Sequence, residues 1–371
     1  MLVGLLAVAV ILAASAYAYM HLPMFGALPE GAQLTRLEQS PHYRDGAFRN
    51  LEPIPPVVSG GGMVRALLEY ATTKKDRPAP PVPVVSVKTD LTALDREQDV
   101  VIWLGHWSLF IQIAGRRILV DPVFSDNAAP IPYANRAFAG TNVYSAGDIP
   151  DIDYLLITHD HWDHLDYPTI AALREKTGKV ICPLGVGAHF ARWQYPAGMI
   201  IETDWYDTVQ LGDGLAAHAL PSRHFSGRGL TRDKSLWSAF ALVSPGRKLY
   251  LSGDSGYGSH FREAGERFGG FDLAVLDCGQ YNEAWRFVHM MPEDAAQAAE
   301  DLGADAFLPA HVGKFSIAYH SWDDPFIRLA EASRTRSYRL VTPKLGEPVR
   351  MDDAGQRFAP WWEDMAGRNA Q

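Results

Sequence analysis

LLITHDHWDHLD, residues 155–166, is the stretch that decides the fold of this 371-residue chain. Its apolar first residues predict a buried strand, which ends where three histidines and three carboxylates follow in a turn. Side chains at a strand end stand on a rigid base, and imidazole with carboxylate is the ligand set that suits zinc and similar divalent metals. Within six residues lie four candidate ligands, His159, His161, Asp163 and His164, which is more than one tetrahedral ion readily binds. The stretch therefore predicts two metal ions, rather than a polar loop whose histidines face water.

The composition is that of a chain with a sizeable core, since 47% of its residues are hydrophobic and 11% are aromatic. The net charge is −9 and the sequence pI is about 5.8. This acidic balance disfavours a protein that grips a nucleic-acid backbone, because such proteins usually present a basic face. Cys182 and Cys278 each lie in an apolar run, so we expect two buried free thiols and no disulfide framework.

The N-terminus carries the second strong signal. Residues 1–29 contain no Asp, Glu, Lys or Arg, and 2–20 are almost all Leu, Val, Ile and Ala. A helix of this length can cross the hydrocarbon core of a bilayer. The alternative is a cleavable signal peptide with a small-residue site near Ala16, but the basic start of a signal peptide is missing, which favours an uncleaved anchor. Three arginines among residues 36–49 favour a cytoplasmic location for the rest of the chain, with the periplasmic or secreted side left open.

The chain is expected to divide into four parts. These are a membrane anchor or signal segment (1–29), a Pro- and Gly-rich connector (30–98), a globular domain (99–345) and a C-terminal tail (346–371). The glycines at 60–62 and several prolines interrupt any long element in the connector, with room for a short helix over 64–71.

The order of elements predicts a layered fold. Short β-type runs at 100–104, 109–114 and 117–120, with a hairpin turn at 115–116, precede the histidine-rich turn. Further strands are expected at 154–158, 180–182, 199–202, 206–211, 214–220, 236–243, 248–252, 271–277 and 307–308. Helices are expected at 167–177, ending at Gly178, and at 185–195, 259–268, 292–302 and 323–335. Strands come first and helices then alternate, so we expect two β-sheets packed face to face with helices outside.

Three further residues at strand ends can complete a two-metal site. His224 follows a strand in a glycine-bearing loop and is preferred to His218, which lies in mid-strand. Asp254 follows another strand between glycines, where a carboxylate can bridge two ions, although an Asx turn is the alternative. His311 follows the short strand at 307–308, and such a histidine taken alone would be structural.

Taken in order and spacing, His159, His161, Asp163, His164, His224, Asp254 and His311 resemble the complete ligand set of the metallo-β-lactamase superfamily. The resemblance covers residues 100–330. It implies an α/β (α+β) fold, the αββα four-layer sandwich, with a metallo-β-lactamase-like hydrolase domain over 99–345. It also implies two divalent metal ions, with zinc the expected species. One ion would take His159, His161, His224 and Asp254, and the other would take Asp163, His164, Asp254 and His311.

Several longer strings resemble one branch of that superfamily. N-acylphosphatidylethanolamine-hydrolysing phospholipase D and its bacterial relatives carry strings similar to WLGH at 103–106, LVDPVFS at 119–125, SLW at 235–237, GDSGY at 253–257 and HMMPE at 289–293. YRDGAFRN at 43–50 resembles a stretch found ahead of the domain in bacterial members. One departure is Val312 after the last ligand, where relatives often carry Trp. The resemblance implies a phosphodiesterase that acts on a phospholipid.

Other side chains are assigned roles around the metals. Asp163 and His289 are the expected catalytic residues, the first as a partner of the attacking hydroxide and the second at the substrate or leaving group. Asp121 and Asp166 are expected to orient ligating imidazoles, with turn formation as the alternative for each. The candidates for substrate contact are His106, Tyr257, Tyr281 and His320.

Three functions remain in competition. The first is a dinuclear zinc phosphodiesterase of the phospholipase D type, held at the membrane by its N-terminus. The second is hydrolysis of a lactone, thioester or other carbonyl compound by the same hydroxide. The third is a catalytically silent metal-binding membrane protein, whose expected sign would be a missing ligand. The expected partners are a phospholipid or another small molecule and the membrane, without nucleic acid.

Overall fold

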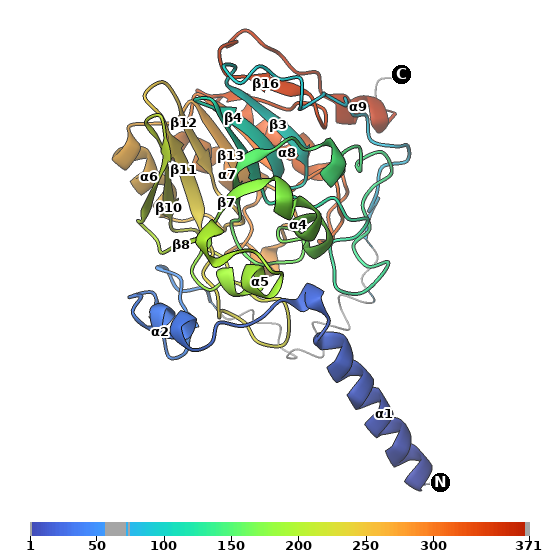
Figure 1. Ribbon diagram of the computed structural model, residues 1–371. Helices are drawn as coiled ribbons and strands as arrows, with labels where there is room; N and C mark the ends of the chain where they lie inside the picture. The colour runs from blue at the N-terminus through green and yellow to red at the C-terminus, as the bar shows by residue number, and fades with distance from the viewer. Residues whose placement is uncertain (1, 56–71, 73–74, 368–371) are drawn as a thin grey trace.

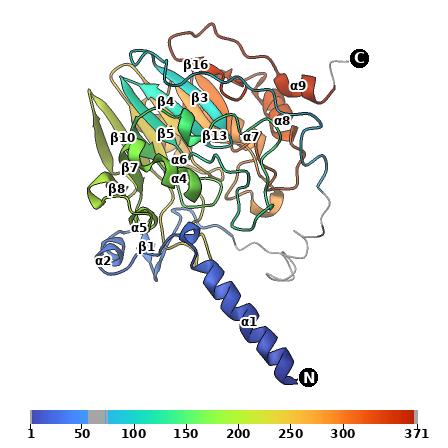
Figure 2. The same ribbon diagram turned by 45° about the vertical axis from the view of Figure 1, so that its right-hand side comes forward.

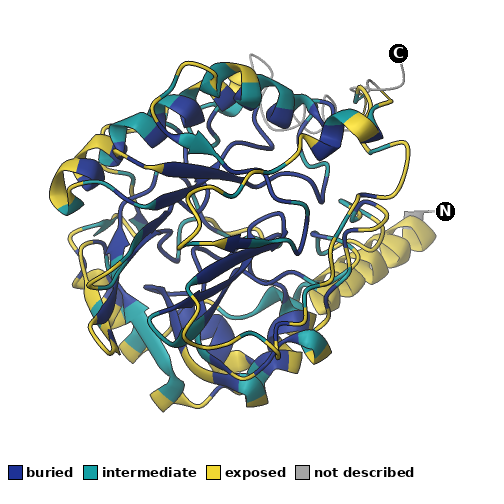
Figure 3. Cartoon of the chain, turned by 90° about the horizontal axis from the view of Figure 1, so that it is seen from above, coloured by how far each residue is buried: buried dark blue, intermediate teal, exposed yellow. Residues whose placement is uncertain are grey.

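Two seven-stranded β-sheets lie face to face, with helices on their outer faces, in the computed structural model of the protein (Figures 1 and 3). The structure describes residues 2–55, 72 and 75–367. The helix expected over 64–71 lies outside these residues. Two sheets between helical layers form an α+β sandwich, which confirms the predicted fold class.

The first sheet has the strand order β16-β3-β4-β5-β6-β7-β8. Its strands are β3 (Val100–Gly105), β4 (Ser108–Ile113), β5 (Arg116–Val120), β6 (Ile152–Leu156), β7 (Thr177–Pro183), β8 (Ile200–Thr203) and β16 (Pro348–Arg350). β3, β4 and β5 pair antiparallel, whereas β5 to β8 run parallel. Helices α4 (Tyr167–Leu173) and α5 (Gly187–Arg192) connect the parallel strands, as parallel pairing requires.

The second sheet has the order β15-β14-β13-β12-β11-β10-β9. Its strands are β9 (Thr208–Gly212), β10 (Leu215–Leu220), β11 (Ala239–Val243), β12 (Lys248–Leu251), β13 (Leu273–Asp277), β14 (Ala306–Ala310) and β15 (Arg339–Leu340). The helices beside it are α6 (His260–Phe268), α7 (Pro292–Asp301) and α8 (Asp324–Ser333). Short 3-10 turns are η1 (Pro23–Phe25), η2 (Ala146–Asp148), η3 (Arg174–Lys176), η4 (Ala197–Met199) and η5 (Glu283–Trp285).

The pairing of the second sheet brings several strand ends to one edge. β12, β13 and β14 are parallel, and β10 runs in the same direction because it and β12 are both antiparallel to β11. The residues that follow β10, β12 and β14 include His224, Asp254 and His311. β6 of the facing sheet ends at Leu156, directly before the histidine-rich turn. The topology therefore carries four separate stretches of chain to one place.

The helix after the histidine-rich turn is shorter than predicted. α4 ends at Leu173 and a 3-10 turn continues to Lys176, so the predicted helix end at Gly178 is wrong. Gly178 instead lies in β7. A Cβ atom there would stand 2.6 Å from the backbone oxygen of Asp153 in β6. The glycine allows two strands to approach closely and does not end a helix.

The C-terminal residues predicted as a tail are part of the fold. β16 pairs antiparallel with β3 at the edge of the first sheet. Helix α9 (Trp361–Met365) buries Trp361 and Trp362, and the Trp361 ring lies 5.0 Å from that of Phe326 in α8. The predicted boundary at residue 345 therefore divides one hydrophobic core, and two adjacent tryptophans are the sequence signal that the prediction overlooked.

The described part of the predicted connector also packs against the two sheets. Helix α2 (Ala32–Glu38) is followed by a hairpin of β1 (Tyr43–Arg44) and β2 (Ala47–Phe48). Phe48 is buried in a small cluster with Leu184, Trp205, Leu236 and Trp237. Residues 43–50 are thus an integral part of the globular unit and not a free spacer.

Helix α1 (Leu2–Met20) stands away from the sheets (Figures 1 and 2). Residues 3–20 are long and apolar enough to cross a membrane, and none of them is buried inside the structure. A core helix of a soluble protein would bury one face, so this helix fits a membrane anchor or a signal segment.

Truncation of Trp361 tests whether the C-terminal residues belong to the core. Trp361→Ala is expected to lower the free energy of unfolding by about 3–5 kcal/mol, because it leaves a large cavity beside Trp103 and Phe326. Urea unfolding of the detergent-solubilised protein measures the change. The control Arg357→Ala removes an exposed side chain from the same segment and should shift stability by less than about 0.5 kcal/mol. Equal stability of the two variants would mean that the segment is a tail after all.

Candidate metal centre

The turn after β6 supplies four of the predicted ligands, and its backbone is held by Asp121. The Asp121 carboxylate accepts hydrogen bonds from the backbone nitrogen of Thr158 at 2.8 Å and from its hydroxyl at 2.5 Å. Because the Thr158 hydroxyl donates its hydrogen bond to Asp121, it accepts a hydrogen bond from Nδ1 of His159 at 3.0 Å. The neutral His159 ring then carries a lone pair on Nε2, the atom that faces the centre of the site.

His159, His161, His224 and Asp254 form the first ligand group, with one ligand atom of each within 4.8 Å of the others. Nε2 of His159 lies 3.0 Å and Nε2 of His224 lies 3.1 Å from Nδ1 of His161. His224 donates its Nδ1 proton to the backbone oxygen of Val288 at 3.0 Å, so its Nε2 also carries a lone pair. A single proton on His161 can satisfy at most one of these two lone pairs. A cation among the three nitrogens would satisfy them all.

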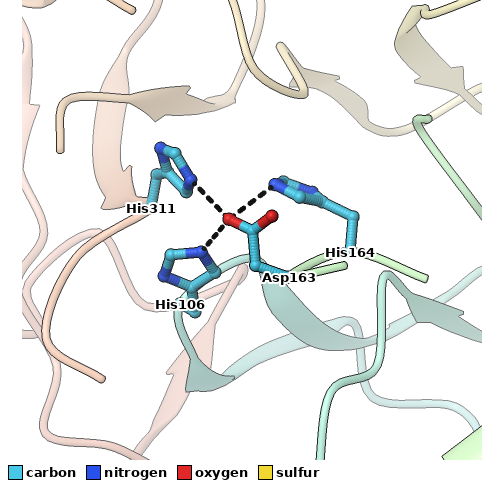
Figure 4. Close-up of side chains that lie close together, drawn as sticks. All are labelled: His106, Asp163, His164 and His311. Atoms are coloured by element: carbon cyan, nitrogen blue, oxygen red, sulfur yellow. Dashed lines mark hydrogen bonds and ion pairs between the residues drawn. The ribbon is translucent and has the colours of Figure 1, made fainter. Parts of the chain in front are cut away.

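Asp163, His164, His311 and His106 form the second group (Figure 4). Nδ1 of His164 donates to Asp121 at 2.8 Å, and its buried Nε2 has no hydrogen-bond partner among the described residues. That nitrogen faces the Oδ2 atoms of Asp254 at 3.2 Å and of Asp163 at 3.6 Å. Nε2 of His311 lies 3.0 Å from Oδ2 of Asp163. Ring nitrogens and carboxylate oxygens thus converge in a buried place.

Asp254 lies between the two groups. Its Oδ2 atom is 3.2 Å from Nε2 of His164, 3.4 Å from His311, 3.6 Å from His224 and 3.8 Å from His159. Gly253 precedes it with φ of 56°, and a Cβ atom at this position would touch Thr158 at 3.0 Å. The glycine therefore lets the loop after β12 approach the turn after β6. This carboxylate therefore lies where it could contact cations held by either group.

The charges in the site favour a cation. Burial lowers the pKa of His161 to about 4 and the pKa values of His159 and His224 well below the usual range, which keeps these rings neutral. Burial also lowers the pKa of His311, but Asp254 and Asp277 outweigh it and raise that pKa to about 10. Positive charge is therefore favoured beside Asp254, and neutral imidazoles with a carboxylate are donors that fit a divalent metal.

Both ligand groups that the resemblance implied are brought together by the structure, with His106 as an additional member. His106 is buried and has a backbone φ of 55°. Its Nε2 lies 2.8 Å from Oδ2 of Asp163. Burial lowers the pKa of His106 to about 4, so the neutral ring donates this proton and orients the Asp163 carboxylate. The structure thus places this residue behind Asp163 rather than at a substrate.

The two carboxylates expected to orient imidazoles differ. Asp121 contacts His164 directly, in the predicted manner. Asp166 accepts its hydrogen bonds from Ser125 and from the hydroxyl of Thr169, and not from a ligand histidine among the described residues. The expected role of Asp166 is thus replaced by a turn-forming one, the alternative that its position before α4 allowed.

Asp277 is a site residue that the sequence analysis missed. It ends β13 and is fully buried. Its Oδ1 atom accepts from Nδ1 of His311 at 3.2 Å, and its Oδ2 atom accepts from Nδ1 of His289 at 2.9 Å. An acid at the end of an apolar strand was the available signal, the same one that identified Asp254. Such carboxylates fix the ring orientation of a ligating histidine.

A cavity of about 800 Å³ opens on the two ligand groups. His161, Asp163, His224, Asp254, His289 and His311 lie at its polar part. The apolar part is formed by Phe48, Pro53, Ile54, Pro55, Phe225, Trp237, Trp285, Val288 and Ile317. Residues 48–55 of the predicted connector thus complete the cavity. Asn50 holds them there, since its side chain bonds both the backbone nitrogen and the backbone oxygen of His224.

Three other candidates for substrate contact lie away from this cavity. The hydroxyl of Tyr257 donates to Asp301 at 2.5 Å, and its ring lines a separate cavity of about 750 Å³. Tyr281 is buried and donates to Asp324. His320 stacks on the Tyr281 ring, with centroids 4.4 Å apart. Closeness in sequence to a site loop therefore did not identify the cavity wall, because these rings turn towards helices α7 and α8.

Comparisons with known proteins agree with this geometry. A family model described as a beta-lactamase superfamily domain matches residues 116–312. An uncharacterized protein of Mycobacterium tuberculosis is 37% identical over 332 residues, which are 88% of each chain. The mitochondrial N-acyl-phosphatidylethanolamine-hydrolyzing phospholipase D of Saccharomyces cerevisiae is 31% identical over 263 residues, covering 67% of this chain and 55% of that protein. The structure of a metallo hydrolase from Ignicoccus hospitalis is similar in fold, with a TM-score of 0.52 at 18% identity over 68% of this chain and 97% of that one.

The difference between Asp121 and Asp166 can be measured as metal affinity. Asp121→Asn is expected to weaken zinc binding about 10–100-fold, because the imidazole of His164 loses its carboxylate partner. Asp166→Asn should leave affinity unchanged. Asn tolerates the positive φ of position 121 and is also a good N-cap before α4, so neither backbone is disturbed. Competition with a chromophoric chelator gives both values, and equal losses would contradict the assignment.

Proposed function

The chain belongs to the beta-lactamase superfamily and is a metal-dependent hydrolase, and we propose that it cleaves an N-acylphosphatidylethanolamine-like lipid between the phosphate and the N-acylethanolamine. The observation that carries the proposal is the apolar cavity of about 800 Å³ that ends at the paired ligand groups. A polar or sugar-like substrate would leave its aromatic and proline wall unused. The yeast relative, a phospholipase D by name, supports the same substrate class.

We assign seven ligands to two zinc ions. His159, His161, His224 and Asp254 would hold one ion, and Asp163, His164, Asp254 and His311 the other. When bound, such a pair lowers the pKa of water and neutralises developing charge on phosphoryl oxygens. His106 holds Asp163 through Oδ2 and thereby sets the direction of the carboxylate at the cavity wall. Asp163 is the group we assign to orient the attacking hydroxide.

His289 is the residue we assign to the leaving group. It lines the cavity, and its Nδ1 donates to Asp277, so Nε2 remains for contact with a substrate oxygen. A histidine in this position can give a proton to the departing alkoxide of the N-acylethanolamine. Asp277 would stabilise the charged ring before the transfer.

Helix α1 supplies a reason why the substrate should be a membrane lipid. We propose that α1 is an uncleaved membrane anchor with the catalytic part on the cytoplasmic side, as Arg36, Arg44 and Arg49 after the helix favour. An enzyme tethered in this way meets bilayer lipids at a high effective concentration.

A substrate screen tests the proposal. The full-length protein in detergent, loaded with zinc, manganese or iron, is offered N-acylated phosphatidylethanolamine, nucleotide diesters and lactones. We expect release of phosphatidic acid and N-acylethanolamine, with about two metal equivalents per chain by elemental analysis. Turnover of lactones with intact phospholipid would replace the proposal by carbonyl hydrolysis. Bound metal without turnover of any of the three classes would indicate a silent metal-binding protein.

Asp163→Asn is the matched inactive variant for this screen. The amide keeps the shape of the side chain but removes a negative charge from the second ligand group, so we expect turnover to fall by more than about 100-fold. Circular dichroism should remain that of the parent protein. Retained turnover would count against the dinuclear mechanism.

The role of His289 predicts a dependence on the leaving group. His289→Ala should lower kcat about 100-fold for a lipid with an alkoxide leaving group, because no proton donor remains. Hydrolysis of a nitrophenyl phosphodiester should change little, since nitrophenolate departs without a proton. Metal content should stay at the parent value. Equal losses on both substrates would assign His289 to the integrity of the site instead.

A further inference from the structure

We propose that the face of the protein around the C-terminal end of α1 lies on the lipid bilayer, with the tips of two loops, at residues 131–133 and 230, in the headgroup region and the metal cavity beside them. The proposal rests on the proposed function in taking α1 as a membrane span. The two loops are far apart in sequence, and neither carries a ligand of the metal centre.

Helix α1 is joined to the catalytic part without a flexible spacer. The residues directly after it are held by hydrogen bonds: Trp193 Nε1 bonds the backbone oxygen of Pro23 at 2.7 Å, and Arg228 Nη2 bonds that of Met24 at 2.8 Å. Gly26, with φ of 70°, packs so closely on His189 that a Cβ atom would stand 1.9 Å from Nδ1 of that ring. The direction of the helix therefore sets the direction of the domain relative to the bilayer.

The same contacts reach the metal centre. Arg228 is buried and its Nη1 donates to the backbone oxygens of Asp160 at 2.9 Å, within the ligand turn, and of Leu165 at 2.7 Å, directly after it. The Asp160 carboxylate accepts from the backbone nitrogen of Gly227 at 2.7 Å and from the Ser235 hydroxyl at 2.6 Å. One arginine thus ties the end of the membrane helix to the turn that carries four ligands.

Large apolar side chains are exposed around the end of α1. Tyr19, in the last turn of the helix, donates to the backbone oxygen of Pro130 at 2.5 Å, which places the following Ile131 and Tyr133 beside the helix. Leu230 lines a cavity together with Met20 and Phe25. The exposed fractions are 63% for Ile131, 81% for Tyr133 and 87% for Leu230. Single exposed apolar residues are common, but these cluster at the level where the span leaves the bilayer.

The metal cavity shares its wall with this face. Within the loop of residues 225–234, Phe225 and Arg232 line the metal cavity, while Leu230 lines the cavity at the end of α1. In the ligand turn, His161 faces the metal cavity and its neighbour Asp160 faces the other. A loop seated in the headgroups would therefore place the cavity beside the lipids it is proposed to admit.

We assign the bilayer to this face because the face surrounds the end of a helix that is long enough to cross a membrane. α1 projects from this side of the molecule in both views (Figures 1 and 2). If α1 spans the membrane, the surface that surrounds its end must face lipid headgroups, where amphipathic tyrosines and apolar tips are favoured.

Site-directed fluorescence on the full-length protein tests the proposal without any assay of activity. Tyr133→Cys and Leu230→Cys are labelled with a nitrobenzoxadiazole fluorophore and reconstituted into vesicles of phosphatidylethanolamine and phosphatidylglycerol. The two native cysteines are buried, and burial raises the pKa of both thiols, so the introduced thiols react selectively. Tyr206→Cys is the matched control, because Tyr206 is also an exposed tyrosine with positive φ (44% exposed) but contacts Arg267 in α6.

The labels at 133 and 230 should shift to shorter wavelength on reconstitution and be quenched by doxyl-labelled lipid but not by iodide. The label at 206 should keep its emission wavelength on reconstitution and be quenched by iodide but not by doxyl-labelled lipid. Labels at 133 and 230 that respond as the control does would overturn the proposal. A blue shift without quenching by doxyl lipid would do so too, because it would assign the face to a protein partner or a second copy.

A second measurement separates this inference from the proposed function. Leu230→Asp should reduce turnover of N-acylphosphatidylethanolamine in vesicles and leave turnover of a soluble nitrophenyl diester unchanged. Equal turnover of the vesicle lipid by Leu230→Asp and the parent protein would count against the docking face. Lipid-quenched labels in a protein that does not hydrolyse any phosphodiester would support the docking face while removing the proposed function.

Discussion

The buried carboxylate of Asp254 is the constraint on which the rest of the site depends. Its Oδ2 atom lies within 3.8 Å of Nε2 atoms from four histidines, which reach it from the turn after β6 and from the loops after β10 and β14. A buried carboxylate is costly unless positive charge or donated protons surround it, and burial keeps the rings of His159 and His224 neutral. A divalent cation would both neutralise the carboxylate and bind the lone pairs of the neutral rings. Metal binding by these groups would therefore be coupled to the folding of this edge of the sandwich.

A second layer of hydrogen bonds orients these imidazoles. Asp121, Asp277 and the backbone oxygen of Val288 each accept a hydrogen bond from the Nδ1 atom of a ring, which fixes the ring orientation and turns Nε2 towards the centre of the site. Asp121 and Asp277 end, or directly follow, strands of the two facing sheets. Each of the two facing sheets thus supplies one carboxylate that orients a histidine of the candidate metal centre.

The site is also continuous with the N-terminal helix. Arg228 and Asp160 bind the ligand turn, the loop that follows His224 and the residues after α1 into one rigid unit. The candidate metal centre and the residues that follow α1 are therefore linked through a few buried hydrogen bonds. Residues 48–55 close the cavity from the same N-terminal region, so the segment before the first sheet serves the site and does not merely lead to it.

The sequence by itself predicted most strands and helices between residues 100 and 335, the sandwich class and the seven residues that the structure brings together, because apolar runs followed by His or Asp leave a local pattern that resembles a known family. It did not reveal Asp277 as a partner of two histidines or Tyr281 as a partner of Asp324, since those contacts join residues distant along the chain. It also set the domain boundary too early at residue 345, because the pairing of β16 with β3 spans almost the whole domain. Which side chains line the cavity was decided by the tertiary structure alone, because a side chain's direction depends on how its loop packs against other elements and not on its distance from a motif.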